Sequence, residues 1–143
     1  MDKLTREAHE HGKILESMVF FEKFLKTITS DDAENYTVRL HQFSDEYIVE
    51  HFEFEEQEIF PLILQKGSSE EKEFIEELQY DHDQILASLA EFKEIISLHD
   101  PQPPTKEQVK KIIKSSETVI SQILVHAQKE DERLFPALKK YKV

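Results

Sequence analysis

The chain contains one histidine–glutamate phrase twice. "HFEFEEQEIFP" begins at His51, and "HAQKEDERLFP" begins at His126. Both phrases start with histidine, have glutamate at the fifth position and close on Phe-Pro. Because residues four apart lie on the same face of an α-helix, His51 shares a face with Glu55, and His126 shares one with Glu130. Each pair can offer an imidazole nitrogen and a carboxylate oxygen to a metal ion.

A second phrase is also repeated. "HGKILESM" begins at His11 and "HDQILASL" begins at His82, and an acidic residue precedes each histidine. From residue 11 to residue 82 the offset is 71 residues, and from residue 51 to residue 126 it is 75 residues. The chain therefore reads as two related helical hairpins. Such hairpins can pack about a pseudo-twofold axis, which would bring the repeated histidines together.

Together the two phrases offer four imidazoles and two carboxylates. This mixed set suits iron, manganese or zinc better than calcium or magnesium, which prefer oxygen ligands. Because a carboxylate has two oxygens, each glutamate could bridge two ions, with the remaining positions open or held by water or by an oxo or hydroxo bridge. Carboxylates buried without a metal are costly unless protonated or hydrogen-bonded, so we expect metal-free protein to be less stable and looser around His51 and His126. The predicted metal ligands are His11, His51, Glu55, His82, His126 and Glu130.

Apolar residues at helical spacing predict the elements that position these side chains. Four amphipathic helices are expected: one over residues 3–29, one that runs to about residue 65, a third with apolar positions from Phe74 to Ile96, and a fourth with apolar positions from Ile112 to Leu134. Short links between them favour an all-α fold, an antiparallel up-down-up-down four-helix bundle built from two repeated hairpins. The presence of only two glycines argues against a turn-rich β fold.

Capping residues predict where the helices begin and end. Ser30 or Asp31 is the expected N-cap of the second helix, and Gly67 suits its C-terminal cap. "SSEE" directly after Gly67 predicts a capping box for the third helix. Thr105, with Gln108 three residues later, predicts the start of the fourth.

Prolines mark three further places. "HDPQPPT" over residues 99–105 is expected to be a loop, because prolines disrupt a helix interior. Pro61 and Pro136 each remove a helix hydrogen bond just beyond the repeated glutamates. They predict matching kinks, or the points where the two helices fray.

Length and composition limit the function further. The 143 residues predict a single domain over residues 1–143. A net charge of −12 gives no basic footprint for nucleic acid or an anionic membrane, so neither partner is expected. The absence of cysteine excludes disulfides, thiolate metal sites and cysteine nucleophiles. The N-terminal residues contain no apolar signal core, and no stretch is apolar enough to cross a bilayer, so a cytoplasmic location is expected.

The repeated phrases make the chain resemble the hemerythrin-like family, the hemerythrin/HHE cation-binding domains. "EHGKIL", "HFEFEEQEIFP", "DHDQIL" and "HAQKEDERLFP" occur in this order across essentially the whole chain. The resemblance implies an antiparallel four-helix bundle around a non-heme centre of two iron ions, Fe-O-Fe, with manganese or zinc less favoured. Position by position, the family's ligands fall on the six residues predicted above.

The chain departs from the oxygen-carrying members at two positions. Leu86 stands where the carriers have a fifth histidine, so one iron should be more open than in a carrier. The carriers use an aspartate five residues after the last histidine, which is Asp131 here. Glu130 matches the internal repeat better and is the preferred ligand.

The pattern is more similar to family members linked to iron–sulfur repair, to nitric oxide or peroxide handling, and to iron or oxygen sensing. We expect a di-iron protein that binds or reacts with O2, NO or peroxide; an iron-sensing, iron-donating or storage module is the alternative. Enzyme, sensor and carrier all stay open, and no redox partner is indicated. The cysteine-bearing N-terminal segment of the repair proteins has no counterpart here, which argues against direct transfer of that role.

Two other classes share the four-helix fold. A histidine phosphotransfer domain needs one exposed histidine, and acid-neighboured histidines occur here at residues 11, 82 and 99. A metal-free interaction bundle needs no histidine at all. Neither class explains the repeated His-Glu pairs.

Several further side chains have weaker indications. Tyr47 and Gln122 precede the repeated histidines by one turn and could hydrogen-bond near the ligands or act as an outer redox group, although plain packing is favoured. Phenylalanines in residues 20–24 and 52–60 are expected to build core and wall off the site. The expected surface or loop residues are His9, His41, His99, Glu53, Glu56 and Glu58.

Overall fold

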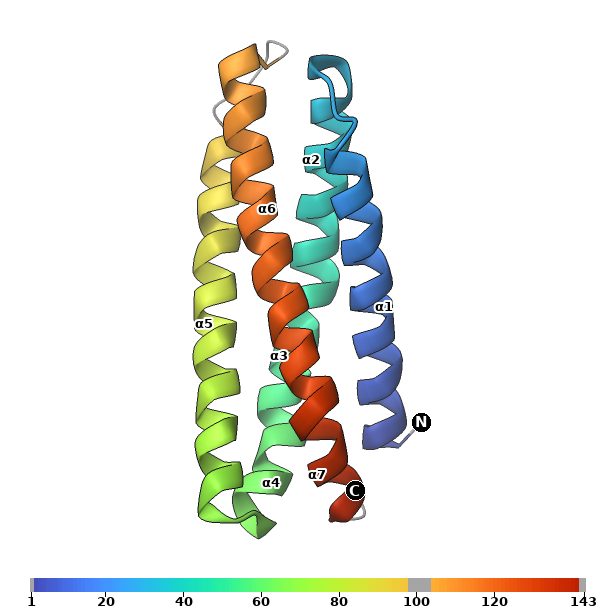
Figure 1. Ribbon diagram of the computed structural model, residues 1–143, viewed down its shortest axis with the longest axis vertical. Coiled ribbons are helices and arrows are strands. Elements are labelled where there is room, and N and C mark those ends of the chain that lie inside the picture. The colour runs from blue at the N-terminus through green and yellow to red at the C-terminus, as the bar shows by residue number, and fades with distance from the viewer. Residues whose placement is uncertain (1, 98–103, 142–143) are drawn as a thin grey trace.

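The computed structural model describes residues 2–97 and 104–141, and these form helices without any β-strand. Four helical rods lie side by side, and each runs opposite to the preceding one (Figure 1). The start of the first rod and the end of the last lie at the same end of the bundle (Figure 1). The predicted all-α four-helix bundle is therefore confirmed.

Short π-helical turns interrupt two of the rods. The first rod is α1 (Lys3–Leu25), and the third is α5 (Ser69–Ser97). The second rod consists of α2 (Ser30–Phe43), η1 (Ser44–Ile48), α3 (Val49–Phe54), η2 (Glu55–Ile59) and α4 (Phe60–Lys66), where η denotes a π turn. The fourth consists of α6 (Lys106–Lys129), η3 (Glu130–Leu134) and α7 (Phe135–Lys140).

The start of the second rod differs from the prediction. Thr29 has the extended backbone of an N-cap (φ −117°, ψ 173°), and its carbonyl accepts the N–H of Ala33 at 3.0 Å. Ser30 is already helical, so the prediction of Ser30 or Asp31 as the N-cap was wrong. Asp31 lies in the first turn instead, where the helix dipole favours negative charge. The first rod also ends earlier than expected, at Leu25.

The two predicted capping boxes are confirmed. Ahead of α5, the Glu71 N–H donates to Ser68 Oγ at 3.2 Å, and the Ser68 N–H donates to Glu71 Oε1 at 2.9 Å. Thr105 and Gln108 make the same reciprocal pair ahead of α6. These caps satisfy backbone N–H groups that would otherwise lack partners at the helix starts.

Gly67 ends α4, as predicted. Its N–H donates to the Ile63 carbonyl at 2.7 Å, and a Cβ at this position would lie only 2.6 Å from the same oxygen. The tight turn into α5 therefore requires glycine. The predicted proline-containing loop over residues 99–105 lies mostly outside the described residues.

The π turns η2 and η3 occupy matching places in the two hairpins. Each begins at a repeated glutamate, and the N–H of the residue before the proline bonds five residues back, from Phe60 to Glu55 and from Phe135 to Glu130. A proline ring clashes with the carbonyl four residues back in a regular α-helix, and the wider turn relieves that clash. Helices α4 and α7 continue beyond the prolines, so neither rod frays at Pro61 or Pro136.

The apolar core consists of two clusters. The larger includes Met18, Leu40 and Ile112, and the smaller includes Ile63 and Leu138. Along each rod, the buried histidines and glutamates lie where positions of one cluster give way to positions of the other, whereas Thr37, Ser44 and Ser116 lie among positions of the larger cluster. The bundle thus holds a polar layer between two apolar ones.

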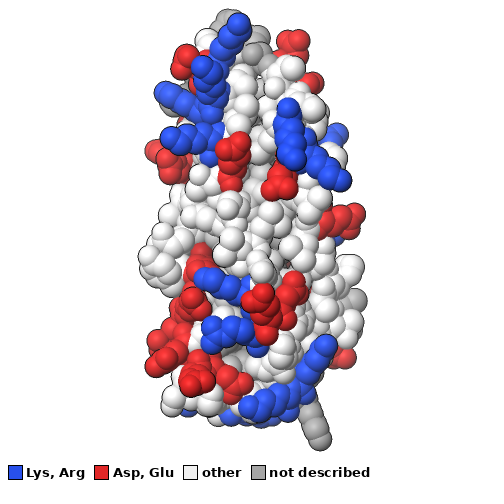
Figure 2. Space-filling model, viewed as in Figure 1, with Lys and Arg blue, Asp and Glu red and all other residues white. Residues whose placement is uncertain are grey.

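The surface carries charges of both signs. On the face shown in Figure 2, basic and acidic side chains gather toward the two ends, with a mostly uncharged band between them. Within the described part of the chain, no helix combines the length and the apolar character needed to span a membrane. Phe20 is 50% exposed, so the expectation that it joins the core was wrong, whereas Phe21 is buried.

Candidate metal centre

The carboxylate of Glu55 lies between histidines of the two hairpins. Its Oε2 atom is 3.4 Å from Nε2 of His51 on the same rod, and its Oε1 atom is 2.9 Å from Nε2 of His82 on α5. All three side chains are buried. One oxygen facing each hairpin is the arrangement that a carboxylate bridging two metal ions would need.

Glu130 repeats this arrangement from the fourth rod. Its Oε2 atom is 3.6 Å from Nε2 of His126 on the same rod, and its Oε1 atom is 3.4 Å from Nδ1 of His11 on α1. Both histidines are buried, and Glu130 is 2% exposed. Asp131, the alternative ligand, has a side chain that is 55% exposed and lies 2.9 Å from the other ring nitrogen of His11.

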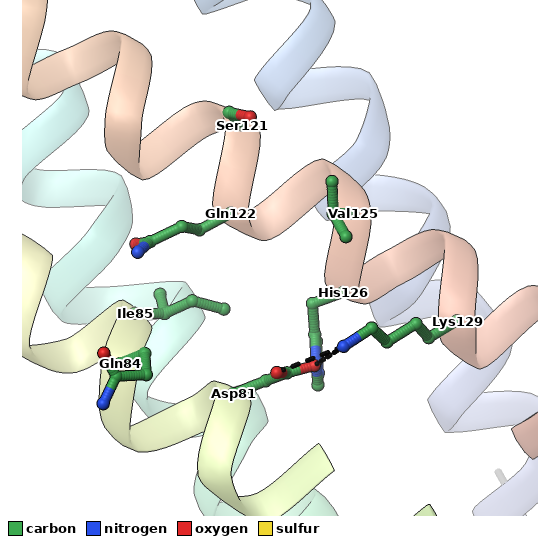
Figure 3. Close-up of a pocket in the computed structure, with 8 residues that line it drawn as sticks. All are labelled: Asp81, Gln84, Ile85, Ser121, Gln122, Val125, His126 and Lys129. Carbon is green, nitrogen blue, oxygen red and sulfur yellow. Dashed lines mark hydrogen bonds and ion pairs between the residues drawn. The ribbon is translucent and has the colours of Figure 1, made fainter. Parts of the chain in front are cut away.

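Two acidic residues fix the orientation of the histidines on the HxxxE phrases. Nδ1 of His51 lies 2.9 Å from Glu10 Oε1, and Nδ1 of His126 lies 3.0 Å from Asp81 Oδ2 (Figure 3). An ionised carboxylate only accepts hydrogen bonds, so we assign the proton to Nδ1 in both rings. When each ring is neutral, as metal binding requires, its Nε2 lone pair then points toward Glu55 or Glu130. These acids are the ones that precede the histidines of the second repeated phrase.

Basic side chains keep the two orienting acids ionised. Arg6 Nε donates to Glu10 at 2.7 Å, and Lys129 Nζ donates to Asp81 at 3.0 Å. Burial acts to raise the pKa of both acids, but hydrogen bonds from the histidines and these cations outweigh it and lower both pKa values. This role was not predicted from the sequence, although an acidic residue precedes both His11 and His82.

We expect Asp81→Asn to weaken metal binding about tenfold and Asp81→Ala to weaken it about 100-fold, because losing the hydrogen-bond partner of a ligand histidine costs about 10–100-fold in affinity. The measurement is competition against a chelator of known affinity. Asp83→Asn, at an exposed position on the same helix, is the matched control. Equal affinities for the Asp81 and Asp83 variants would refute the orienting role.

Aromatic rings and a second acid enclose His82. Phe52 stacks on its imidazole at a centroid distance of 3.8 Å, and Phe60 lies 5.3 Å away, so these phenylalanines do wall off the site. Nδ1 of His82 lies 2.9 Å from Glu56 Oε2, and Glu56 also accepts a bond from Gln79 at 2.7 Å. The expectation that Glu56 is only a solvated charge was therefore wrong.

A third buried carboxylate belongs to Glu7 on α1, a residue that was not predicted to join the site. Glu7 is 0% exposed, and its Oε1 atom lies 3.7 Å from Nε2 of His51. It precedes His11 by four residues, so the two side chains share a helix face. That spacing was the available signal, but a single acid at such a position is usually solvated.

Donor atoms converge closely enough for metal ions. Several buried atoms that could bind a metal lack a hydrogen-bond partner in the described part of the chain, among them Glu55 Oε2, His126 Nε2 and Glu130 Oε2. Buried polar atoms rarely stay unpaired, so these orphans fit a centre that binds cations. Two groups have ligand atoms that all lie within 4.8 Å of one another: Glu55, His82 and His126; and Glu7, His51, Glu55 and Glu130. Glu55 belongs to both groups, and His11 to neither.

The protonation states of the site are strongly perturbed. Burial, followed by the charge of Glu130, raises the pKa of Glu55 well above its usual value. Burial opposes the charge on Glu130, but the neighbouring Glu55 carboxyl and the charge of His126 hold its pKa well below the usual value. Burial and then the charge of His126 lower the pKa of His82 to about 4, whereas Glu130 and Asp81 overcome burial and raise that of His126 to about 9.

The weaker candidates lie around the site or away from it. Tyr47 is partly buried and stacks on Phe43, in keeping with a packing role. Gln122 lines a pocket beside His126, and its buried Oε1 atom has no hydrogen-bond partner there. Leu86 is partly buried against the larger core cluster.

Two of the histidines without a repeat partner fall in the described part of the chain, and both lie outside the centre. His9 is exposed on α1, as expected. His41 is partly exposed and lies 3.4 Å from Asp45. His99 is outside the described residues.

A helical bundle with buried histidines and carboxylates at its middle defines a metal-binding four-helix protein. The chain matches the family model described as Hemerythrin HHE cation binding domain over residues 2–138, and it belongs to this family. Comparisons with curated proteins and with solved structures gave no match. The family assignment implies cation binding, and the histidine–glutamate clusters described above could hold the metal.

Proposed function

We propose that this protein holds two iron ions between its hairpins and binds or reduces a small oxidant such as O2, NO or peroxide. The placement of Glu55 and Glu130 carries the proposal, because each carboxylate faces one histidine of either hairpin. Two bridging carboxylates and two pairs of imidazoles suit a pair of redox-active ions. The proposed ligands are His11, His51, Glu55, His82, His126 and Glu130.

When bound, the two irons would supply electron transfer and open coordination positions for a small molecule. The chain's own residues set the conditions for that chemistry. Glu10 and Asp81 hold the Nδ1 protons of the ligand histidines and direct the Nε2 atoms inward. Phe52 and Phe60 cover His82 and exclude water from that side.

A surface pocket between α5 and α6 borders the proposed centre at His126. It has a volume of about 270 Å³ and includes Gln84, Ile85, Gln122 and His126 in its lining (Figure 3). The proposed ligand side chains are themselves at most 6% exposed, so a molecule that reaches metal ions held by them must be small. A diatomic molecule or peroxide therefore fits the site better than an organic substrate does.

The direct test is elemental analysis of protein purified from iron-supplemented cells. We expect two irons per chain, with a near-ultraviolet and visible spectrum that changes on anaerobic reduction and recovers on exposure to O2. A reversible cycle supports binding, whereas oxidation with consumption of O2 supports redox turnover. A metal-free protein, or one with a single zinc per chain, would overturn the proposal.

An iron-sensing, iron-donating or storage module is the second candidate. It is favoured by the position of the centre, a polar layer between two apolar clusters that links metal loading to packing of all four rods. A sensor of this kind would change its stability with iron while showing no reaction with O2. The phosphotransfer class is disfavoured within the described residues, because the acid-neighboured histidines His11 and His82 are buried.

A further inference from the structure

Glu7 is the one carboxylate of the centre that the repeated phrases do not contain. Its side chain is fully buried on α1, and neither oxygen has a hydrogen-bond partner among the described residues. An unpaired carboxylate in such a place is expensive unless it is protonated or binds a cation. The guanidinium of Arg6, which is next to Glu7 in the sequence, donates its hydrogen bond to Glu10 and not to Glu7.

The internal repeat shows that Glu7 is confined to one half of the centre. With the offset of 71 residues that relates His11 to His82, the counterpart of Glu7 is Leu78. Leu78 is fully buried in the smaller apolar cluster. The α1 half thus has a buried acid where the α5 half has a hydrocarbon side chain.

The surroundings of Glu7 fit a shared ion. Glu7, His51, Glu55 and Glu130 offer ligand atoms that all lie within 4.8 Å of one another. Ligands bound to one ion at about 2.1 Å are about 3–4.2 Å apart, so this cluster needs only small side-chain movements to close around a metal. His11 follows Glu7 by one helical turn and borders the cluster through Glu130.

We propose that Glu7 is a third carboxylate ligand and that it makes the two metal positions unequal. The position between α1 and α3 takes Glu7, His11 and His51 in addition to the bridging glutamates. The position between α5 and α6 takes only His82 and His126 beside the bridges, and it keeps the open coordination site. This inference rests on the proposed di-iron function and adds which ion has more protein ligands, five at the first position against four at the second.

The pocket supports the same division of roles. It lies between α5 and α6 and is lined by His126, so it borders the half of the centre that lacks the extra carboxylate (Figure 3). The aligned position in that half is Leu78, which contributes no donor. A small anion such as azide should therefore bind the ion held by His82 and His126.

The test compares Glu7→Leu and Glu7→Gln with the wild type, and it uses Glu16→Gln, at an exposed position of α1, as the matched control. Each protein is reconstituted with 57Fe, and its metal content, chelator competition and Mössbauer spectrum are measured. We expect two doublets of equal area in the wild type and in the control. The Glu7 variants should alter one doublet and weaken one of the two metal equivalents at least tenfold. Azide should perturb the other doublet.

Stability separates a ligand from a structural acid. Glu7→Leu introduces, at a fully buried position, the same residue type that Leu78 provides in the α5 half. The metal-free variant should therefore be at least as stable as the metal-free wild type. Its gain in melting temperature on iron loading should be smaller than that of the wild type. A structural acid would instead change both forms alike.

The outcomes are distinguishable from failure of the proposed function. If the wild type does not bind two irons, the di-iron proposal fails and this inference fails with it. If the wild type binds two irons but the Glu7 variants keep both equivalents and both doublets unchanged, only the ligand role of Glu7 is refuted. Azide acting on the doublet that Glu7 controls would refute the assignment of the open position.

Discussion

Replacing His51 and His126 together by alanine is expected to abolish metal loading while leaving the helical content unchanged. The double variant removes one imidazole from each proposed metal position. Losing only the hydrogen-bond partner of a ligand costs about 10–100-fold in affinity, and losing the ligand itself should cost more at both positions. The helices should persist, because the capping boxes and both apolar clusters are untouched.

The measurement is iron per chain after reconstitution and removal of loosely bound metal, with far-ultraviolet circular dichroism of the same samples. A His9→Ala and His41→Ala double variant changes the same residue type outside the cluster and should keep full loading. Full iron stoichiometry in the His51 and His126 variant would disprove the ligand assignment. Loss of metal from both double variants would point to a general loss of stability instead.

Much of the bundle could be predicted because its signals are local. The spacing of apolar residues indicates which face of each helix is buried. The capping boxes at Ser68 and Thr105 specify where α5 and α6 begin, through hydrogen bonds between residues only three apart. The internal repeat adds the prediction that matching histidines of the two hairpins lie near one another. The structure brings Glu55 and Glu130 close to histidines of both hairpins, and the double alanine variant tests whether these residues bind metal.

Contacts between helices were harder to predict. Spacing indicates that Glu7 shares a face with His11, but only the packing of α1 against the other rods decides that this face buries an acid. Glu10 and Glu56 reach histidines of other rods through long side chains, and no periodicity within one helix reports such a contact. An acidic residue whose long side chain reaches a ligand on another rod is therefore easily taken for a surface charge.

The π turns show a different limit. Pro61 and Pro136 indicated that the α-helical hydrogen-bond pattern must change, but the sequence did not distinguish a kink, a frayed end and a widened turn. The wider turn was selected because α4 and α7 continue into the smaller apolar cluster and must stay packed there. The two π turns also begin at Glu55 and Glu130, so the change in helical pitch helps set where these two carboxylates point.

Metal-free protein is expected to lose roughly 3 kcal/mol of unfolding free energy between pH 6.5 and pH 9, mainly through His126. The folded-state pKa of His126 is raised from 6.5 to about 9, so folding favours its protonated form. That stabilisation is complete below pH 6.5 and disappears as the pH rises through 9, at about 1.4 kcal/mol per pKa unit. Against a typical total of about 5–15 kcal/mol, the loss should be easy to measure.

The other perturbed groups of the centre do not reverse this trend. The pKa values of Glu55, Glu7 and His11 are also raised, so any proton they lose in this window acts in the same direction. Those of His82 and Glu130 are lowered, and their contributions to stability are already complete above pH 6.5. The sign of the change is therefore set by the groups with raised pKa values.

Metal should counter the loss. Binding requires deprotonated ligands, so iron affinity should rise over the pH range in which metal-free protein weakens, and Fe(II) titration at pH 7 under anaerobic conditions should release protons. Urea unfolding of metal-free protein at pH 6.5 and pH 9 measures the first effect, and calorimetry in buffers of different ionisation enthalpy measures the second. His126→Gln should flatten the pH dependence. Stability that is constant or rising from pH 6.5 to pH 9 in the wild type would contradict the charge arrangement around His126, because a protonated imidazole between Asp81 and Glu130 must lose both partners' attraction when its proton leaves.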